Sequence, residues 1–81
     1  MQYNPALYSA YDAFSVTPSD STVFSGPTRR LWVGGAGNVA VTMVSGSVVT
    51  FNGVLAGTLI PVQCQKVMAT NTTATLILAL V

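Results

Sequence analysis

With 81 residues the chain has room for one domain, and a domain of this size has a small core. Only 6% of its residues are charged, against roughly 25% in an ordinary soluble domain, so we expect copies of itself or a partner to cover much of its surface. The net charge of +1 is too small for a surface that follows nucleic-acid phosphates, and no apolar segment is long enough to predict a membrane helix.

Residues 1–27 predict an extended N-terminal arm. Prolines interrupt it, and each proline removes a backbone donor and disfavours a helix or a central strand. An edge strand is predicted over residues 14–16. Aromatic rings are spaced along the arm, unlike in a typical disordered tail, and four are candidate contact residues: Tyr3, Tyr8, Tyr11 and Phe14. Two interpretations stay open, burial of the rings against a neighbouring subunit or partner, and folding of the rings back onto their own domain.

The first strand after the arm covers residues 30–33. Side chains alternate between the two faces of a strand, so Leu31 and Val33 are predicted to face inward and Arg30 and Trp32 outward. Tryptophan and arginine are enriched in protein interfaces, which makes this outward face a candidate contact surface.

Five clusters of turn residues divide the rest of the chain. Residues 34–38 and 45–47 each predict a hairpin, because glycine supplies the positive φ that a tight turn requires. The pair Asn52-Gly53 is the strongest short-range turn signal of the sequence. Residues 54–57 predict a loop that crosses to another part of the sheet, and residues 69–73 predict the last turn.

Strands are predicted between these turns. Residues 39–44 alternate in pattern, and Val49 and Phe51 are expected to continue the inward face. Pro61 marks the strand over residues 58–62 as an edge or a bulged strand, because proline cannot donate to the ladder.

The C-terminal part continues the β pattern. A bulge is predicted at Gln65 or Lys66, since only an extra residue lets Cys64 and Val67 face the same way. Residues 75–81 are apolar on both faces, which is typical of a barrel centre or a subunit interface. In all, residues 28–81 predict a small antiparallel β-barrel or sandwich of about six strands.

Residue types that carry catalysis are scarce. The sequence has no histidine and no glutamate, and its two carboxylates, Asp12 and Asp20, lie in the arm. Cys64 lacks a neighbouring base and is interpreted as a small buried hydrophobe. We therefore expect no enzyme, no catalytic residue, no metal site and no cofactor.

Five motifs occur in a specific order and spacing. They are Thr-Pro-Ser-Asp-Ser at 17–21, Thr-Arg-Arg-Leu-Trp-Val-Gly-Gly-Ala-Gly-Asn-Val at 28–39, Val-Thr-Phe at 49–51, Ala-Gly-Thr-Leu-Ile-Pro-Val at 56–62, and Lys-Val-Met-Ala-Thr at 66–70 with Thr-Thr-Ala-Thr at 72–75. In this order the sequence resembles the head spike base proteins of gene transfer agents and their relatives among tailed bacteriophages. The resemblance covers residues 17–81.

The resemblance implies a non-enzymatic virion structural protein. Such a protein oligomerises, as a trimer or pentamer, on the outside of the capsid and binds the major capsid protein, as a head spike base or as a cement or decoration protein. A head fibre is a further expected partner, whereas nucleic acid and membrane are not. The expected location is the capsid exterior of a virion assembled in the cytoplasm of a bacterial host.

The predicted interface combines the aromatic arm with two strands of the domain. Besides the four arm rings it contains Arg30, Trp32, Leu76, Leu78 and Leu80. The alternative hypothesis is a receptor- or carbohydrate-binding module of a phage particle, in which Trp32 and the tyrosines stack against a sugar.

Overall fold

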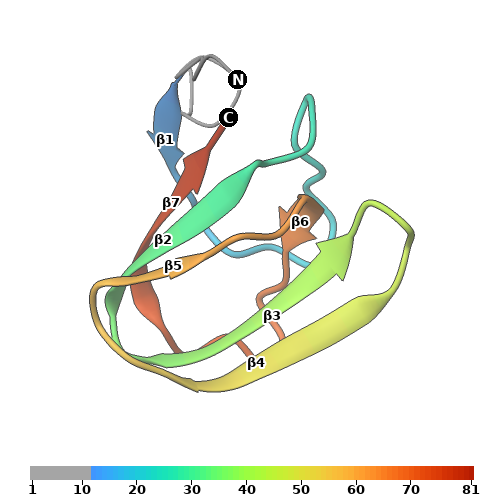
Figure 1. The fold of residues 1–81 in the computed structure, drawn as a ribbon. Coiled ribbons are helices and arrows are strands. Elements are labelled where there is room, and N and C mark those ends of the chain that lie inside the picture. The colour runs from blue at the N-terminus through green and yellow to red at the C-terminus, as the bar shows by residue number, and fades with distance from the viewer. Residues whose placement is uncertain (1–11) are drawn as a thin grey trace, which may run out of the picture.

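The computed structural model describes residues 12–81, which form two antiparallel sheets facing each other, with no helix in this part of the chain (Figure 1). The first sheet has the strand order β1-β7-β2-β5 and the second β4-β3-β6. The predicted all-β fold is confirmed as a sandwich, since the sheets do not close into a barrel. The seven strands are β1 (Ala13–Ser15), β2 (Arg30–Gly35), β3 (Gly37–Met43), β4 (Val48–Val54), β5 (Thr58–Ile60), β6 (Cys64–Val67) and β7 (Thr75–Leu80).

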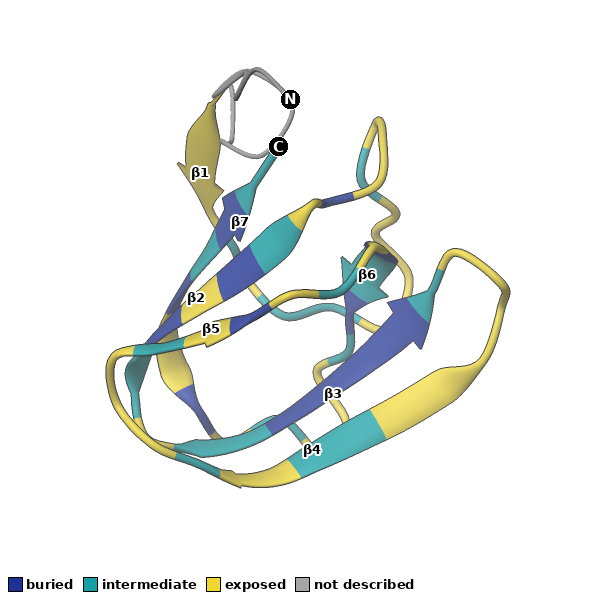
Figure 2. Cartoon of the chain, in the orientation of Figure 1, coloured by how far each residue is buried: buried dark blue, intermediate teal, exposed yellow. Residues whose placement is uncertain are grey.

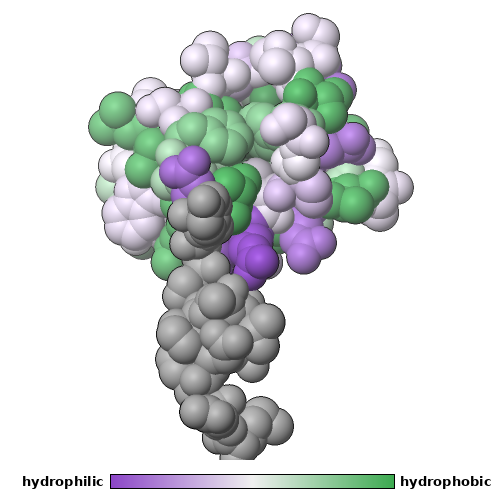
Figure 3. All heavy atoms as spheres, turned by 90° about the horizontal axis from the view of Figure 1, so that it is seen from above, coloured by the Kyte–Doolittle hydropathy of each residue, from purple (hydrophilic) through white to green (hydrophobic). Residues whose placement is uncertain are grey.

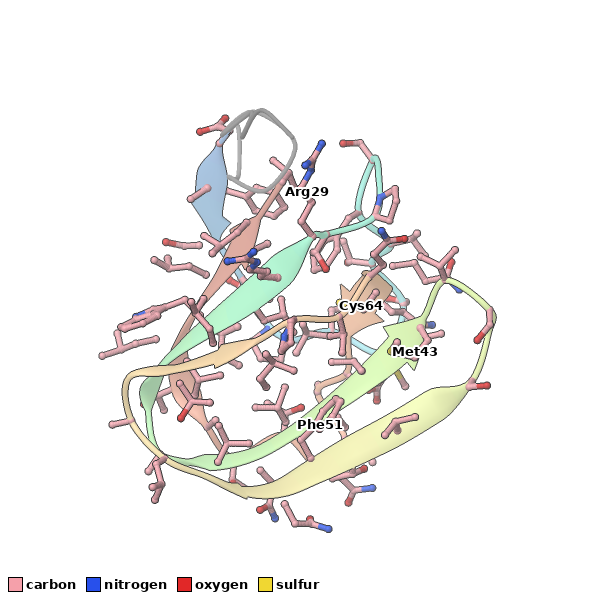
Figure 4. The ribbon with its side chains drawn as sticks, viewed as in Figure 1. Arg29, Met43, Phe51 and Cys64 are labelled. Atoms are coloured by element: carbon pink, nitrogen blue, oxygen red, sulfur yellow. The ribbon has the colours of Figure 1, made fainter. Side chains whose placement is uncertain are left out.

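The core lies between the two sheets. Leu31 and Val33 of β2 and Val39 and Val41 of β3 are each 0% exposed, so the predicted inward face of β2 is confirmed. Phe51 of β4 packs against this cluster and points into the space between the sheets (Figure 4).

The second sheet departs from simple alternation. Ala40 and Thr42 lie on the opposite face of β3 from the core valines and are nevertheless buried, so β3 is covered on both faces (Figure 2). The Thr42 hydroxyl donates to Met68 Sδ at 3.3 Å. Val49 has the expected inward register, opposite Val41, yet it is 38% exposed because β4 is an edge strand.

The hairpin predicted over residues 34–38 is wrong. β2 pairs with β5 and β7, whereas β3 pairs with β4 and β6, so the glycine-rich residues turn a corner from one sheet to the other. Gly37 has a φ of 154°, and a Cβ there would lie 2.5 Å from Ala74 N. Glycine is therefore required by close approach of the backbone to another segment.

The turn predicted at Asn52-Gly53 is also wrong, because both residues lie inside β4. The register passes from Val39 opposite Phe51 to Gly37 opposite Val54, which leaves one extra residue in β4. Gly53 takes a φ of 68°, and its N–H donates to Asn38 Oδ1 at 2.9 Å. The glycine thus makes a bulge, which needs the same positive φ as a turn.

Four local predictions are confirmed. Residues 45–47 connect β3 and β4 as a hairpin, with the Gly46 N–H donating to Met43 O at 2.9 Å. β5 is an edge strand that ends before Pro61. Gln65 is the extra residue in the pairing of β6 with β3, where both Cys64 and Val67 are buried. The loop over residues 55–57 crosses from the second sheet to the first, as expected.

Residues 12–28 lie against the sandwich. β1 pairs with β7 at the edge of the first sheet, in the region where an edge strand was expected. Farther along, the backbone N–H groups of Ser19, Phe24 and Thr28 donate to the carbonyl oxygens of Val67, Gln65 and Cys64 at 2.9, 2.8 and 3.1 Å. This segment therefore covers the outer edge of β6. A boundary between residues 27 and 28 stays a prediction.

Candidate functional site

The first sheet presents an apolar outer face. Leu31 and Val33 point inward, so Trp32 between them points outward, together with its Cα partners Leu59 on β5 and Leu78 on β7. The same register places Arg30 opposite Leu80 on this side. We call this surface the Trp32 face and define it by the residues Ala13, Ser15, Arg30, Trp32, Leu59, Leu76, Leu78 and Leu80.

An open hollow of about 460 Å³ lies on the Trp32 face. It is lined by Ser15, Val16, Trp32, Gly34, Leu76, Ile77 and Leu78. The Trp32 side chain reaches toward the turn before β5, where a Cβ added at Gly57 would lie 3.9 Å from its Cη2. The indole is 37% exposed, so one part of the ring is packed on the sheet and the rest remains available.

Leu76 is the most exposed large apolar side chain of residues 12–81, at 77%. Its φ of 54° lies in the left-handed region, which a leucine rarely adopts. Gly34 makes room for it, since a Cβ there would lie 2.9 Å from Leu76 Cβ. Strained backbone of this kind concentrates at functional sites, and here it projects a leucine into solvent beside the hollow.

Charge is nearly absent from this surface. Arg30 is the charged member of the Trp32 face, and no charged residue occurs from Leu31 to Gln65. Figure 3 shows one side of the molecule, on which strongly hydrophilic side chains are few and apolar ones are scattered. Contact through the Trp32 face would bury apolar area at little cost in ion desolvation.

The buried thiol is not part of this face. Cys64 is 0% exposed, and burial raises the pKa of its thiol. The Thr28 hydroxyl donates to Val62 O at 3.0 Å, accepts from Cys64 N at 3.2 Å and lies 3.4 Å from Cys64 Sγ. A protonated, enclosed thiol is a poor nucleophile, which agrees with the structural interpretation of Cys64.

Asp20 holds the arm onto the last turn of the domain. Its carboxylate accepts hydrogen bonds from the Thr70 N–H at 2.9 Å and the Thr70 hydroxyl at 2.6 Å. These bonds lower the pKa of Asp20. Lys66 Nζ donates to the Asp20 backbone oxygen at 2.9 Å.

Residues 12–81 contain neither a metal-binding cluster nor a membrane-spanning helix. No three histidine, cysteine or acidic residues there come together as a metal site. The same residues contain no helix that is long and apolar enough to cross a membrane.

The structure brings five of the predicted interface residues together. Arg30, Trp32, Leu76, Leu78 and Leu80 all lie on the Trp32 face. Phe14 does not join them. It is the Cα partner of buried Ala79 and packs edge-on against Phe24, with ring centroids 5.6 Å apart.

The remaining predicted residues, Tyr3, Tyr8 and Tyr11, lie outside the described residues. Sequence reasoning missed Leu59, which is 43% exposed beside Trp32. Its alternation with buried Ile60 in the strand before Pro61 was the available signal.

Comparison with known proteins finds a similar chain among the solved structures. The sequence matches no family model, and no curated protein is significantly similar to it. A chain in the solved structure "Capsid of native GTA particle computed with C5 symmetry" superposes with a TM-score of 0.79 at 36% sequence identity, over 89% of this chain and 83% of that chain. The chain belongs to the same family as this chain of the gene transfer agent capsid. This match supports the part of the sequence-based resemblance that concerns the capsid of a gene transfer agent.

Proposed function

We propose that the chain is a non-enzymatic structural protein of a gene transfer agent or phage particle, situated on the capsid exterior. It oligomerises there and binds the major capsid protein, as a head spike base or as a cement or decoration protein. Membership of the family of a gene transfer agent capsid chain supports a role in the particle. The observation that carries the proposal is the largely apolar Trp32 face, in which Arg30 is the one charged member and which a protein partner would cover.

A carbohydrate-binding role has less support from this surface. Sugars need several hydrogen-bonding groups as well as a stacking ring. The hollow beside Trp32 has one polar side chain in its lining, Ser15. Its shape and chemistry fit apolar protein side chains better than a glycan.

Incorporation into particles tests the proposal. Leu76→Asp places a charge beside the hollow of the Trp32 face, and aspartate tolerates the positive φ of 54° better than leucine does. The matched control is Val48→Asp on the second sheet, since Val48 is also highly exposed, at 63%. We expect Leu76→Asp to reduce the amount of protein on purified particles by at least about tenfold, the effect of about 1.4 kcal/mol in binding, and Val48→Asp to leave it unchanged.

Other outcomes would contradict the proposal in distinct ways. Equal incorporation of both variants would show that the Trp32 face is not the binding surface. Absence of the wild-type protein from purified particles would overturn the structural role itself. A symmetry-resolved image of the particle would separate a spike base at a vertex from a cement protein, and a trimer from a pentamer.

A further inference from the structure

The direction in which the chain enters the first sheet bears on what covers the Trp32 face. Asp12 lies at the end of β1 that points away from the hollow. Its N–H donates to Val81 O at 3.0 Å, and the Val81 N–H donates to Asp12 O at 2.8 Å. β1 then runs toward the hollow, whose lining includes Ser15 and Val16. If the residues before Asp12 continued in the direction of β1, they would extend away from the hollow of the same copy. Covering that hollow in the same copy requires a reversal of the chain just before Asp12.

The chemistry of residues 1–11 matches the face. The segment Met-Gln-Tyr-Asn-Pro-Ala-Leu-Tyr-Ser-Ala-Tyr has no charged residue and three tyrosines. Tyrosine buries a large ring while its hydroxyl stays in contact with water or a polar group. This suits the Trp32 face, where Trp32, Ala13 and leucines lie beside the polar side chains of Ser15 and Arg30.

The length of the segment is sufficient to reach another copy. Extended at roughly 3.3 Å per residue, residues 1–11 span about 36 Å. The molecule measures 42 × 25 × 19 Å, so this span exceeds its two shorter dimensions and is long enough to reach a molecule packed beside it.

We propose that residues 1–11 of one copy lie on the Trp32 face of a neighbouring copy, with a tyrosine ring in the hollow beside Trp32. The exchange builds on the proposed function, because it names the partner as a second copy of this chain. It assigns the strained, exposed Leu76 a partner and makes each contact head-to-tail, which is the kind of interface that closes into a ring.

Directed cross-linking between full-length variants tests the exchange. One variant carries Tyr8→Cys, and a second, isotopically labelled with ¹⁵N, carries Ser15→Cys at an exposed position of the hollow. The buried Cys64 stays in place. After mixing and mild oxidation, we expect mixed disulfide dimers, identified by mass, to exceed by at least fivefold those formed with a Ser21→Cys partner, whose exposed serine lies off the face.

Two results would overturn the exchange. One is a mixed-dimer yield equal to that of the Ser21→Cys control. The other is efficient cross-linking within a single Tyr8→Cys/Ser15→Cys chain without mixed dimers, which would show that the segment folds back onto its own domain. Either result leaves the proposed function intact if Leu76→Asp is still lost from particles. Mixed dimers above the control level, together with normal incorporation of Leu76→Asp, would contradict the proposed function alone.

Fluorescence of the wild-type chain gives a second readout that needs no substitution. Trp32 is the single tryptophan of the sequence. Exchange between copies depends on concentration, so we expect the emission maximum to move to shorter wavelength as the protein is concentrated from nanomolar to high micromolar. An emission maximum that is constant over this range would overturn the exchange.

Discussion

The Thr28 hydroxyl is one of the groups that join the N-terminal segment to the chain at the start of β6. Thr28 is 1% exposed. Its hydroxyl donates a hydrogen bond to the Val62 carbonyl and accepts one from the Cys64 N–H. Replacing it with valine keeps the shape of the side chain but leaves both backbone groups unpaired in a buried site. We expect Thr28→Val to lower the free energy of unfolding by about 1–3 kcal/mol, measured by urea denaturation.

Thr28→Ser is the matched control for this prediction. Serine keeps the hydroxyl and loses one methyl group, which costs about 1 kcal/mol. If Thr28→Ser were as destabilising as Thr28→Val, packing of the methyl group rather than the two hydrogen bonds would account for the effect.

Asp20 makes stability depend on pH in the acid range. Hydrogen bonds from the Thr70 side chain and backbone lower the pKa of Asp20 from its ordinary value of 3.8. A group whose pKa is lower in the folded state binds protons more readily when unfolded, so its stabilisation is present above pH 3.8 and is lost as the pH falls below that value. We expect Asp20→Asn to flatten the pH dependence of the melting temperature in this range.

Thr70→Val provides a comparison for the acid titration. It removes the hydroxyl donor to Asp20 but keeps the backbone donor. The slope should therefore fall between those of the wild type and Asp20→Asn. Parallel melting-temperature curves for the wild type and Asp20→Asn would contradict the assignment to this carboxylate.

At the scale of elements, the corner between β2 and β3 depends on Gly37. An alanine there would meet the Ala74 backbone, and its φ of 154° is unfavourable for a residue with a side chain. We expect Gly37→Ala to destabilise the domain by more than about 1 kcal/mol, measured by thermal unfolding. Gly26→Ala is the control, because a Cβ at Gly26 meets nothing within 4 Å. Equal effects of the two substitutions would contradict the role of the close approach at the corner.

The sequence predicts the elements better than their pairing. Leu31 and Val33 alternate with Trp32, and this period of two is a local property that survives in the structure. The corner at residues 34–38 and the bulge at Gly53 use the same glycine chemistry as a hairpin turn, so local reasoning cannot tell them apart. Which strands become neighbours is decided by contacts between distant segments.

For the candidate site too, the sequence shows local patterns but does not show contacts between distant segments. The sequence shows that the leucines of β7 alternate with other apolar residues, which predicts a strand that is apolar on both faces. The side that stays open depends on the position of β7 between β1 and β2, which is a long-range property. The orientation of Phe14 away from the Trp32 face is a long-range property too, since it follows from the register of Phe14 with Ala79.

At the scale of the whole molecule, the sandwich separates two tasks. The valines and leucines between the sheets hold the domain together, while the Trp32 face remains open to solvent in the single chain. A face of this composition limits the solubility of the free protein and favours a covered state in an assembly.

The lack of charge from Leu31 to Gln65 has a consequence for how the assembly responds to its surroundings. Ion pairs weaken as salt screens them, whereas burial of apolar surface does not, and apolar burial weakens on cooling. We expect the fraction of protein that sediments with particles to change little between about 0.05 and 0.5 M sodium chloride. Cooling to about 4 °C should release more protein than salt does. Release by salt and retention in the cold would indicate that charged contacts hold the protein on the particle. A particle fastened in the proposed way would tolerate changes in salinity outside its host and would be most fragile at low temperature.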